Sequence, residues 1–118
     1  MLNLKDRNRG IFSKLVPQGT HIAEVLSVEW CDSDRYGFEG AYEVIYQITT
    51  EDGRVFRHRE VFKTTLNNKR TRDFENYLAD NGIENLDDFV GKREKLTFQH
   101  KIVDGYTFSN IVKREFLS

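Results

Sequence analysis

The feature that most constrains this fold is a pair of alternating segments separated by three turn residues. Residues 41–50 place apolar side chains at every second position: Tyr42, Val44, Tyr46 and Ile48. After the turn residues Glu51-Asp52-Gly53, the alternation continues to residue 62. A period of two is that of a β-strand, and a short segment containing Asp-Gly between two such strands predicts a hairpin. The core therefore has to form on one face of an antiparallel sheet.

The register of this hairpin decides which way its arginines point. A two-residue turn would pair Ile48 with Arg57 and direct the arginines toward the apolar face. A three-residue loop, with Gly53 at the position of positive φ, pairs Ile48 with Phe56 instead. Because a slip of one residue moves every side chain to the other face, burial of the apolar side chains favours the three-residue loop. The outer face then collects Ile45, Gln47, Thr49, Val55, Arg57 and Arg59.

The remaining segments complete a recognisable order. Residues 19–30 alternate with one change of phase, which predicts a long strand with a bulge. The spacing of Phe74, Tyr77 and Leu78 predicts a short helix. One further strand is expected before the Asp104-Gly105 turn and one after it. The protein is thus predicted to be mainly β, with the order β-β-β-α-β-β and one short helix between strands three and four, which is the order of a five-stranded OB-fold barrel.

Composition limits the organisation and the class of function. We expect a basic arm over residues 1–18 and an OB-fold domain over residues 19–118. The single cysteine, Cys31, excludes an intrachain disulfide and favours a reducing, cytoplasmic location. No apolar run approaches the roughly 20 residues of a membrane helix. No metal-ligand spacing, phosphate loop or activated nucleophile is present, so we expect no enzyme, no catalytic residue, no metal and no cofactor.

The net charge of −1 hides an uneven distribution of charge. Residues 54–72 contain seven basic residues and one acidic residue, for a net +6, while the rest of the chain carries −7. The basic residues are Arg54, Arg57, Arg59, Lys63, Lys69, Arg70 and Arg72. A basic patch on an acidic body favours a polyanionic partner. Chance clustering on a solvated face is the alternative.

Aromatic residues in the loop after the first strand suggest how bases would be held. OB-folds bind oligonucleotides on strands two and three and in neighbouring loops, and single-strand binders stack bases on aromatic side chains. Tyr36 and Phe38 either stack bases or plug the end of the barrel. Trp30 continues the buried phase of its strand, which favours core packing over stacking. The expected nucleic-acid-binding residues are Arg57, Arg59, Gln47, Ile45, Trp30, Tyr36, Phe38, Arg54, Lys63, Lys69, Arg70 and Arg72.

Five pieces of the sequence together resemble a known family. They are VPQGTHIAEVLSV, YEVIYQITTEDGR, FENYLADNGI, DDFVGK and DGYTFSNIVKREF, spanning residues 16–117. This pattern is similar to that of the small single-stranded DNA-binding proteins of bacteriophages and mobile elements of low-GC Gram-positive bacteria. The resemblance implies an OB-fold that coats single-stranded DNA in phage replication and recombination. It also implies a dimer, location in the host cytoplasm, and recombinase or annealing proteins as partners.

The leading hypothesis is therefore sequence-tolerant binding of single-stranded DNA, without a membrane partner. Two alternatives stay open at this point. One is an OB-like protein-interaction adaptor of a phage or conjugative complex, in which the outer arginines serve no nucleic acid. The other is an RNA-binding OB module, since the same surface suits either polymer.

Overall fold

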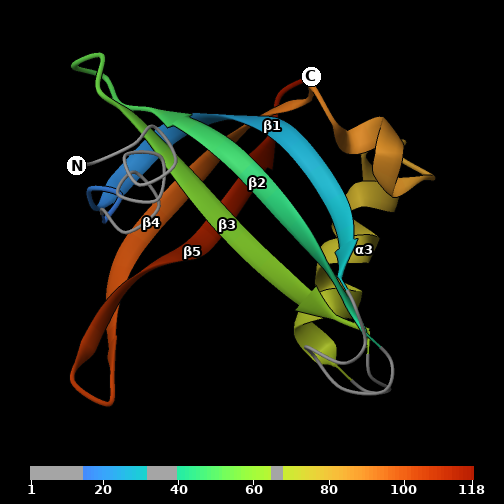
Figure 1. The fold of residues 1–118 in the computed structure, drawn as a ribbon. Helices are drawn as coiled ribbons and strands as arrows, with labels where there is room; N and C mark the ends of the chain where they lie inside the picture. The colour runs from blue at the N-terminus through green and yellow to red at the C-terminus, as the bar shows by residue number, and fades with distance from the viewer. Residues whose placement is uncertain (1–14, 32–39, 65–67) are drawn as a thin grey trace, which may run out of the picture. The chain divides into compact units, whose positions relative to one another are not determined.

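The computed structural model describes residues 15–31, 40–64 and 68–118, and it is mainly β. Its five strands are β1 Gly19–Cys31, β2 Ala41–Thr49, β3 Val55–Lys63, β4 Arg93–Val103 and β5 Tyr106–Phe116. The helix α3 Lys69–Asp80 and the short 3₁₀ helix η1 Leu86–Phe89 lie between β3 and β4 in the chain (Figure 1). The predicted order of three strands, a helix and two strands is confirmed.

The strands form one sheet in the order β3-β2-β1-β4-β5. β1 runs antiparallel to β4, with Gly19 opposite Phe98 and Glu24 opposite Arg93. β4 and β5 form a long antiparallel hairpin. A closed barrel would also need pairing between β3 and β5, and in the part of the chain that the structure describes the sheet is not closed in this way. The five-stranded sheet with its helix is established, while the OB-fold barrel stays a prediction.

The chain divides into two compact units, to both of which β1, β2 and β3 contribute. The first unit comprises residues 1–24, 46–58 and 93–118. The second unit comprises residues 25–45 and 59–92, and therefore contains both helices. The predicted boundary between an arm over residues 1–18 and a domain over residues 19–118 stays a prediction.

Residues at the end of the predicted arm are anchored in the first unit. The side chain of Val16 is buried. Its backbone N–H donates to Ser109 Oγ at 2.8 Å, and its carbonyl oxygen lies 2.9 Å from Nε2 of His100. Both partners belong to the β4–β5 hairpin, so the chain enters β1 from a fixed position.

The β2–β3 hairpin has the three-residue loop that the sequence predicts. Thr50 N–H donates to the Arg54 carbonyl at 2.9 Å, so these two residues form the last pair before the loop. Gly53 N–H donates to the Thr50 carbonyl at 3.0 Å, and Gly53 has φ +84°. The arginines on β3 are accordingly exposed, whereas Phe56 is half-buried.

Aromatic side chains and one ion pair form the core of the first unit. Tyr46 and Phe98 are fully buried. The ring of His58 stacks on Tyr46 at 6.3 Å and meets Phe98 edge-on at 5.1 Å. Arg114 donates to the Tyr46 hydroxyl at 3.0 Å and lies 3.6 Å from the carboxylate of Glu94, which is fully buried. The alternation of β4 thus points Glu94 inward, a position the sequence did not suggest for a charged residue.

The second unit packs α3 against the sheet through aromatic rings. Phe62 and Phe74 stack at 4.1 Å with nearly parallel planes. Asn68 caps the helix, since its Oδ1 accepts from the Thr71 N–H at 3.1 Å. Burial, reinforced by Glu75, raises the pKa of the Tyr42 hydroxyl, which therefore stays neutral and donates to that carboxylate.

The expectation that Trp30 packs in the core is wrong. The buried side chains of this strand are Ala23, Val25 and Cys31, all at odd positions. Trp30 is 67 % exposed, so it does not pack in the core. Its indole lies against Gly40 instead, where a Cβ atom would be only 3.0 Å from Cζ2 of the ring. The alternation of Leu26, Val28 and Trp30 misled because half-buried positions also accept apolar side chains.

The loop geometry makes a prediction about stability. Replacing Gly53 by Ala should lower the free energy of unfolding by about 1 kcal/mol, because a side chain disfavours positive φ. A Cβ at this position meets no atom within 4 Å, so the effect comes from the backbone alone. Urea denaturation measures it, with the neighbouring exposed Glu51→Ala as the matched control, expected to change stability by less than about 0.5 kcal/mol. Equal stabilities for the two variants would contradict the bulged loop.

Candidate nucleic-acid interface

The two arginines of β3 lie on the predicted outer face, but their surroundings differ. Arg57, in the first unit, is exposed and makes no ion pair with any described residue. Arg59, in the second unit, lies 3.3 Å from the carboxylate of Glu43, whose side chain is 18 % exposed. Ile45, the other outward residue predicted for this part of the hairpin, is half-buried. Arg57 is therefore the more available cation of the two.

Most of the positive charge of residues 54–72 is neutralised by neighbouring carboxylates. Besides Arg59, three more cations have acidic partners: Arg54 with Asp52, Lys69 with Asp73, and Arg70 with Glu60. Within the described residues, this leaves three cations of the segment without an ion pair: Arg57, Lys63 and Arg72. The net charge of +6 overstates the patch because most of the pairing carboxylates lie just outside the counted segment.

Arg54 is held inside the turn. The Asp52 carboxylate accepts from the Thr50 hydroxyl and, at 2.9 Å, from the Arg54 Nε. These interactions, the Thr50 hydroxyl first and Arg54 second, hold the pKa of the Asp52 carboxyl below its usual value. Asp52 therefore stays ionised under ordinary conditions and offsets the charge of Arg54.

Arg70 connects α3 to β3 and has a structural environment. Its guanidinium donates to the Val61 carbonyl at 2.7 Å and to the nearly buried carboxylate of Glu60 at 3.0 Å. The same group lies over the ring of Phe62, 4.4 Å from its centroid. Three interactions within the second unit thus fix a side chain that was predicted to bind nucleic acid.

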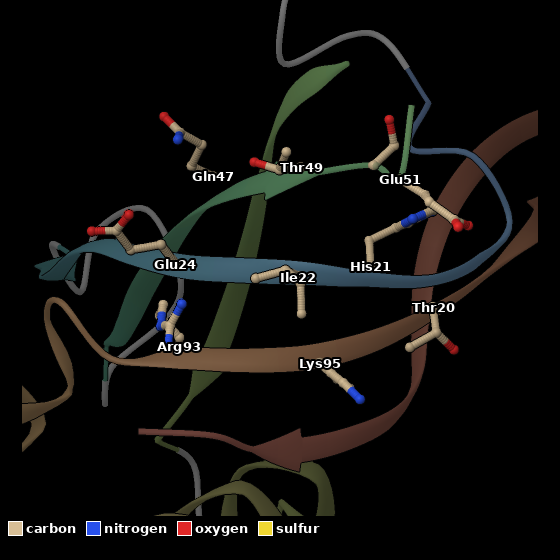
Figure 2. A pocket seen from close by; sticks show the side chains of 10 residues that line it. Thr20, His21, Ile22, Glu24, Gln47, Thr49, Glu51, Arg93 and Lys95 are labelled. Atoms are coloured by element: carbon tan, nitrogen blue, oxygen red, sulfur yellow. The ribbon is translucent and has the colours of Figure 1, made fainter. Parts of the chain in front are cut away.

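A groove opens on the outer face of the first unit, beside the hairpin. Its volume is about 740 Å³, within the range of about 300–1,000 Å³ that is usual for small-molecule sites. Figure 2 shows Ile22 and Glu24 on β1, between Gln47 of β2 on one side and Arg93 and Lys95 of β4 on the other. Thr49 and Glu51 continue the lining toward the β2–β3 loop (Figure 2).

The pairing of β1 with β4 places an acidic and an apolar residue directly opposite two cations in this groove. Glu24 lies directly opposite Arg93, and Ile22 lies opposite Lys95. Neither carboxylate of the groove, Glu24 or Glu51, forms an ion pair with a described residue, and the same holds for Arg93 and Lys95. The polar groups are therefore arranged around the groove without saturating one another.

Arg57 does not line this groove itself, but its pairing partner on β2 does. Antiparallel pairing that begins with Thr50 opposite Arg54 continues to Gln47 opposite Arg57. Both side chains point to the outer face by alternation. The half-buried side chain of Gln47, which lines the groove, makes no hydrogen bond to a described residue. The predicted pair of Gln47 and Arg57 is thus brought together on one side of β1, while Arg93 and Lys95, which were not predicted, lie on its other side on β4.

Two exposed aromatic side chains that the sequence did not predict as stacking residues lie on β5. Tyr36 and Phe38 lie outside the described residues. Tyr106 is 70 % exposed and Phe108 is 51 % exposed, and they share one face of β5. Lys101 lies directly opposite Phe108 on β4, so a cation accompanies the rings. The alternation after Asp104-Gly105 predicts a strand, but it is too weak to predict which face of that strand carries Tyr106 and Phe108.

Arg93 and Lys95 could have been found from the pattern of β4. Leu96 and Phe98 define its inward phase, so Arg93 and Lys95 have to point outward. The expected OB-fold order then brings this strand next to β1. The predicted site lies on strands two and three and neighbouring segments, so these cations of strand four were not among its residues.

Comparisons with models of known protein families and with curated protein sequences find no match. Among the described residues, no helix has the length and apolar character that a membrane span requires. The same residues contain no group of three or more His, Cys, Asp or Glu side chains placed to hold a metal ion.

The contrast between paired and unpaired cations predicts different effects of substitution. Arg70→Ala should lower the free energy of unfolding by about 1–2 kcal/mol, because it leaves the carboxylate of Glu60 without one of its partners. Arg72→Ala, the control on the same helix, removes an exposed cation and should change stability by less than about 0.5 kcal/mol. Chemical denaturation of the two variants measures the difference. Equal effects would show that Arg70 has no structural role.

Proposed function

We propose that this protein binds single-stranded DNA with little sequence dependence, and that the outer face of the first unit is its binding surface. The observation that carries the proposal is the groove between Gln47 and Lys95. Two cations line it, Arg93 and Lys95, and Arg57 lies opposite the lining residue Gln47 on the neighbouring strand. Among the described residues none of these three cations has a carboxylate partner. Phosphodiester groups interact most strongly with cations that are not already neutralised.

The β4–β5 hairpin supplies the second component that single-strand binding requires. Stacking of a base on an aromatic side chain contributes about 1–3 kcal/mol and depends little on base identity. Tyr106 and Phe108 present two exposed rings on one face, with Lys101 beside them. This hairpin belongs to the same unit as the groove, so one strand of nucleic acid can use both.

The wider biological role follows from the sequence resemblance and belongs to the same proposal. It comprises an OB-fold barrel that coats DNA in phage replication and recombination. It further comprises a dimer in the host cytoplasm, with recombinase or annealing proteins as partners. The sheet order β3-β2-β1-β4-β5 supports it, because an OB-fold barrel needs only the further closure of β3 onto β5.

The contribution of Arg57 can be measured against a matched loss of charge. Arg57→Ala should weaken binding of a fluorescent single-stranded oligonucleotide and reduce the slope of log affinity against log salt by about 0.7, the value for one phosphate contact. Arg54→Ala removes one positive charge from the same hairpin, but this cation is already paired with Asp52. Its slope should stay at the wild-type value. Identical slopes for both variants and the wild type would contradict the assignment of Arg57.

A second candidate function, a protein-interaction adaptor, is favoured by the apolar surface of the same hairpin. Ile102 is 73 % exposed and Val112 is 47 % exposed, in addition to the two rings. Ile102 lies opposite Thr107 and therefore on the other face from Phe108, so the hairpin exposes apolar side chains on both faces. Exposed apolar groups of this kind often mark contacts with other proteins.

The two functions predict different results for the hairpin rings. If they stack bases, Phe108→Ala should weaken oligonucleotide binding about tenfold without changing its salt dependence, because stacking releases no counterions. The exposed Val112→Ala serves as the control and should leave the affinity unchanged. Unchanged affinity in Phe108→Ala would favour the adaptor. A matched RNA oligonucleotide in the same titrations tests the remaining alternative, an RNA-binding module.

A further inference from the structure

We propose that the groove between β1, β2 and β4 distinguishes bases and favours cytosine and adenine, which carry an amino group at N4 or N6, over thymine and uracil, which carry the acceptor O4. This inference rests on the proposed binding of single-stranded nucleic acid and adds a graded base preference to it. It starts from the two carboxylates of the groove, Glu24 and Glu51.

An ionised carboxylate only accepts hydrogen bonds, so it selects ligand groups that donate them. Cytosine and adenine carry an amino group, at N4 and N6 respectively, where thymine carries the acceptor O4. Glu24 and Glu51 form no ion pair among the described residues, although cations lie in the same groove. Their acceptor capacity is therefore available to a ligand.

Gln47 and Ile22 give the groove the remaining features of a base site. The side-chain amide of Gln47 both donates and accepts, and it has no hydrogen-bond partner among the described residues. Such a half-buried amide matches the adjacent donor and acceptor atoms on the edge of a base. Ile22 is 39 % exposed and offers an apolar contact to the flat face of the ring.

The balance of charge argues for a nucleotide unit within a strand rather than for phosphate alone. The residues that line the groove include two carboxylates and two cations, Arg93 and Lys95, so the groove carries no net charge. A phosphate without a base would gain the cations but also meet both carboxylates. A nucleotide unit brings one negative charge for the cations together with an amino group for the carboxylates.

Oligo(dC) and oligo(dU) of equal length provide the test, because their bases differ only in the donors and acceptors of one edge. Fluorescence anisotropy at low salt and slightly alkaline pH, where cytosine is unprotonated, should give about fivefold tighter binding of oligo(dC) by the wild-type protein. Glu24→Gln and Glu51→Gln should each reduce this ratio, since a neutral amide is a weaker acceptor than a carboxylate. Glu84→Gln, an exposed residue of the second unit that does not line the groove, should leave the ratio unchanged.

Each outcome decides between specific claims. Equal binding of oligo(dC) and oligo(dU) by the wild-type protein, with salt dependence retained, would overturn the base preference and leave the proposed function intact. A preference that persists in both Glu24→Gln and Glu51→Gln would overturn the role of these carboxylates. Absence of binding to either oligonucleotide would overturn the proposed function itself. Thermal unfolding of each variant confirms that it is folded before its affinities are compared.

Discussion

The backbone pair between Thr50 and Arg54 is the constraint on which the outer surface of this protein depends. It leaves three residues in the loop and requires positive φ at Gly53. The Thr50 hydroxyl, which also accepts from the Arg54 N–H at 3.1 Å, adds a side-chain contact that holds the same pair. Because strand side chains alternate, this single pairing sends Phe56 and Phe62 of β3 inward and its arginines outward. A loop shorter by one residue would invert both faces.

The ion pairs of the structure change which of the basic residues are available to a ligand. A net charge counted along the sequence treats every cation in a segment as available. In the folded chain, four of the seven cations of residues 54–72 are paired with carboxylates, three of which lie outside that segment. Exposed ion pairs add little stability, but they matter for binding because a paired cation attracts a phosphate less strongly. Among the described residues, three of the seven cations stay without an ion pair: Arg57 opposite Gln47, Lys63 at the end of β3, and Arg72 on α3.

Local patterns predicted the hairpin and the helix, because each depends on residues close in the sequence. The position of Trp30 was not predictable in this way, since a mixed run of half-buried side chains carries no clear phase. The buried charge of Glu94 depends on Arg114, which lies 20 positions further along the chain and meets it only through the pairing of β4 with β5. The groove has the same origin, because it joins residues of β1, β2 and β4 that only the sheet order brings together.

The central claim is that a single strand of nucleic acid lies across the outer face of the first unit. Backbone amide chemical shifts, recorded while a single-stranded oligonucleotide is added, test it most directly. The account predicts that the largest changes fall on Gln47, Arg57 and Lys95 and continue along one face of the β4–β5 hairpin. Changes confined to the helix α3, or an unchanged spectrum, would contradict it.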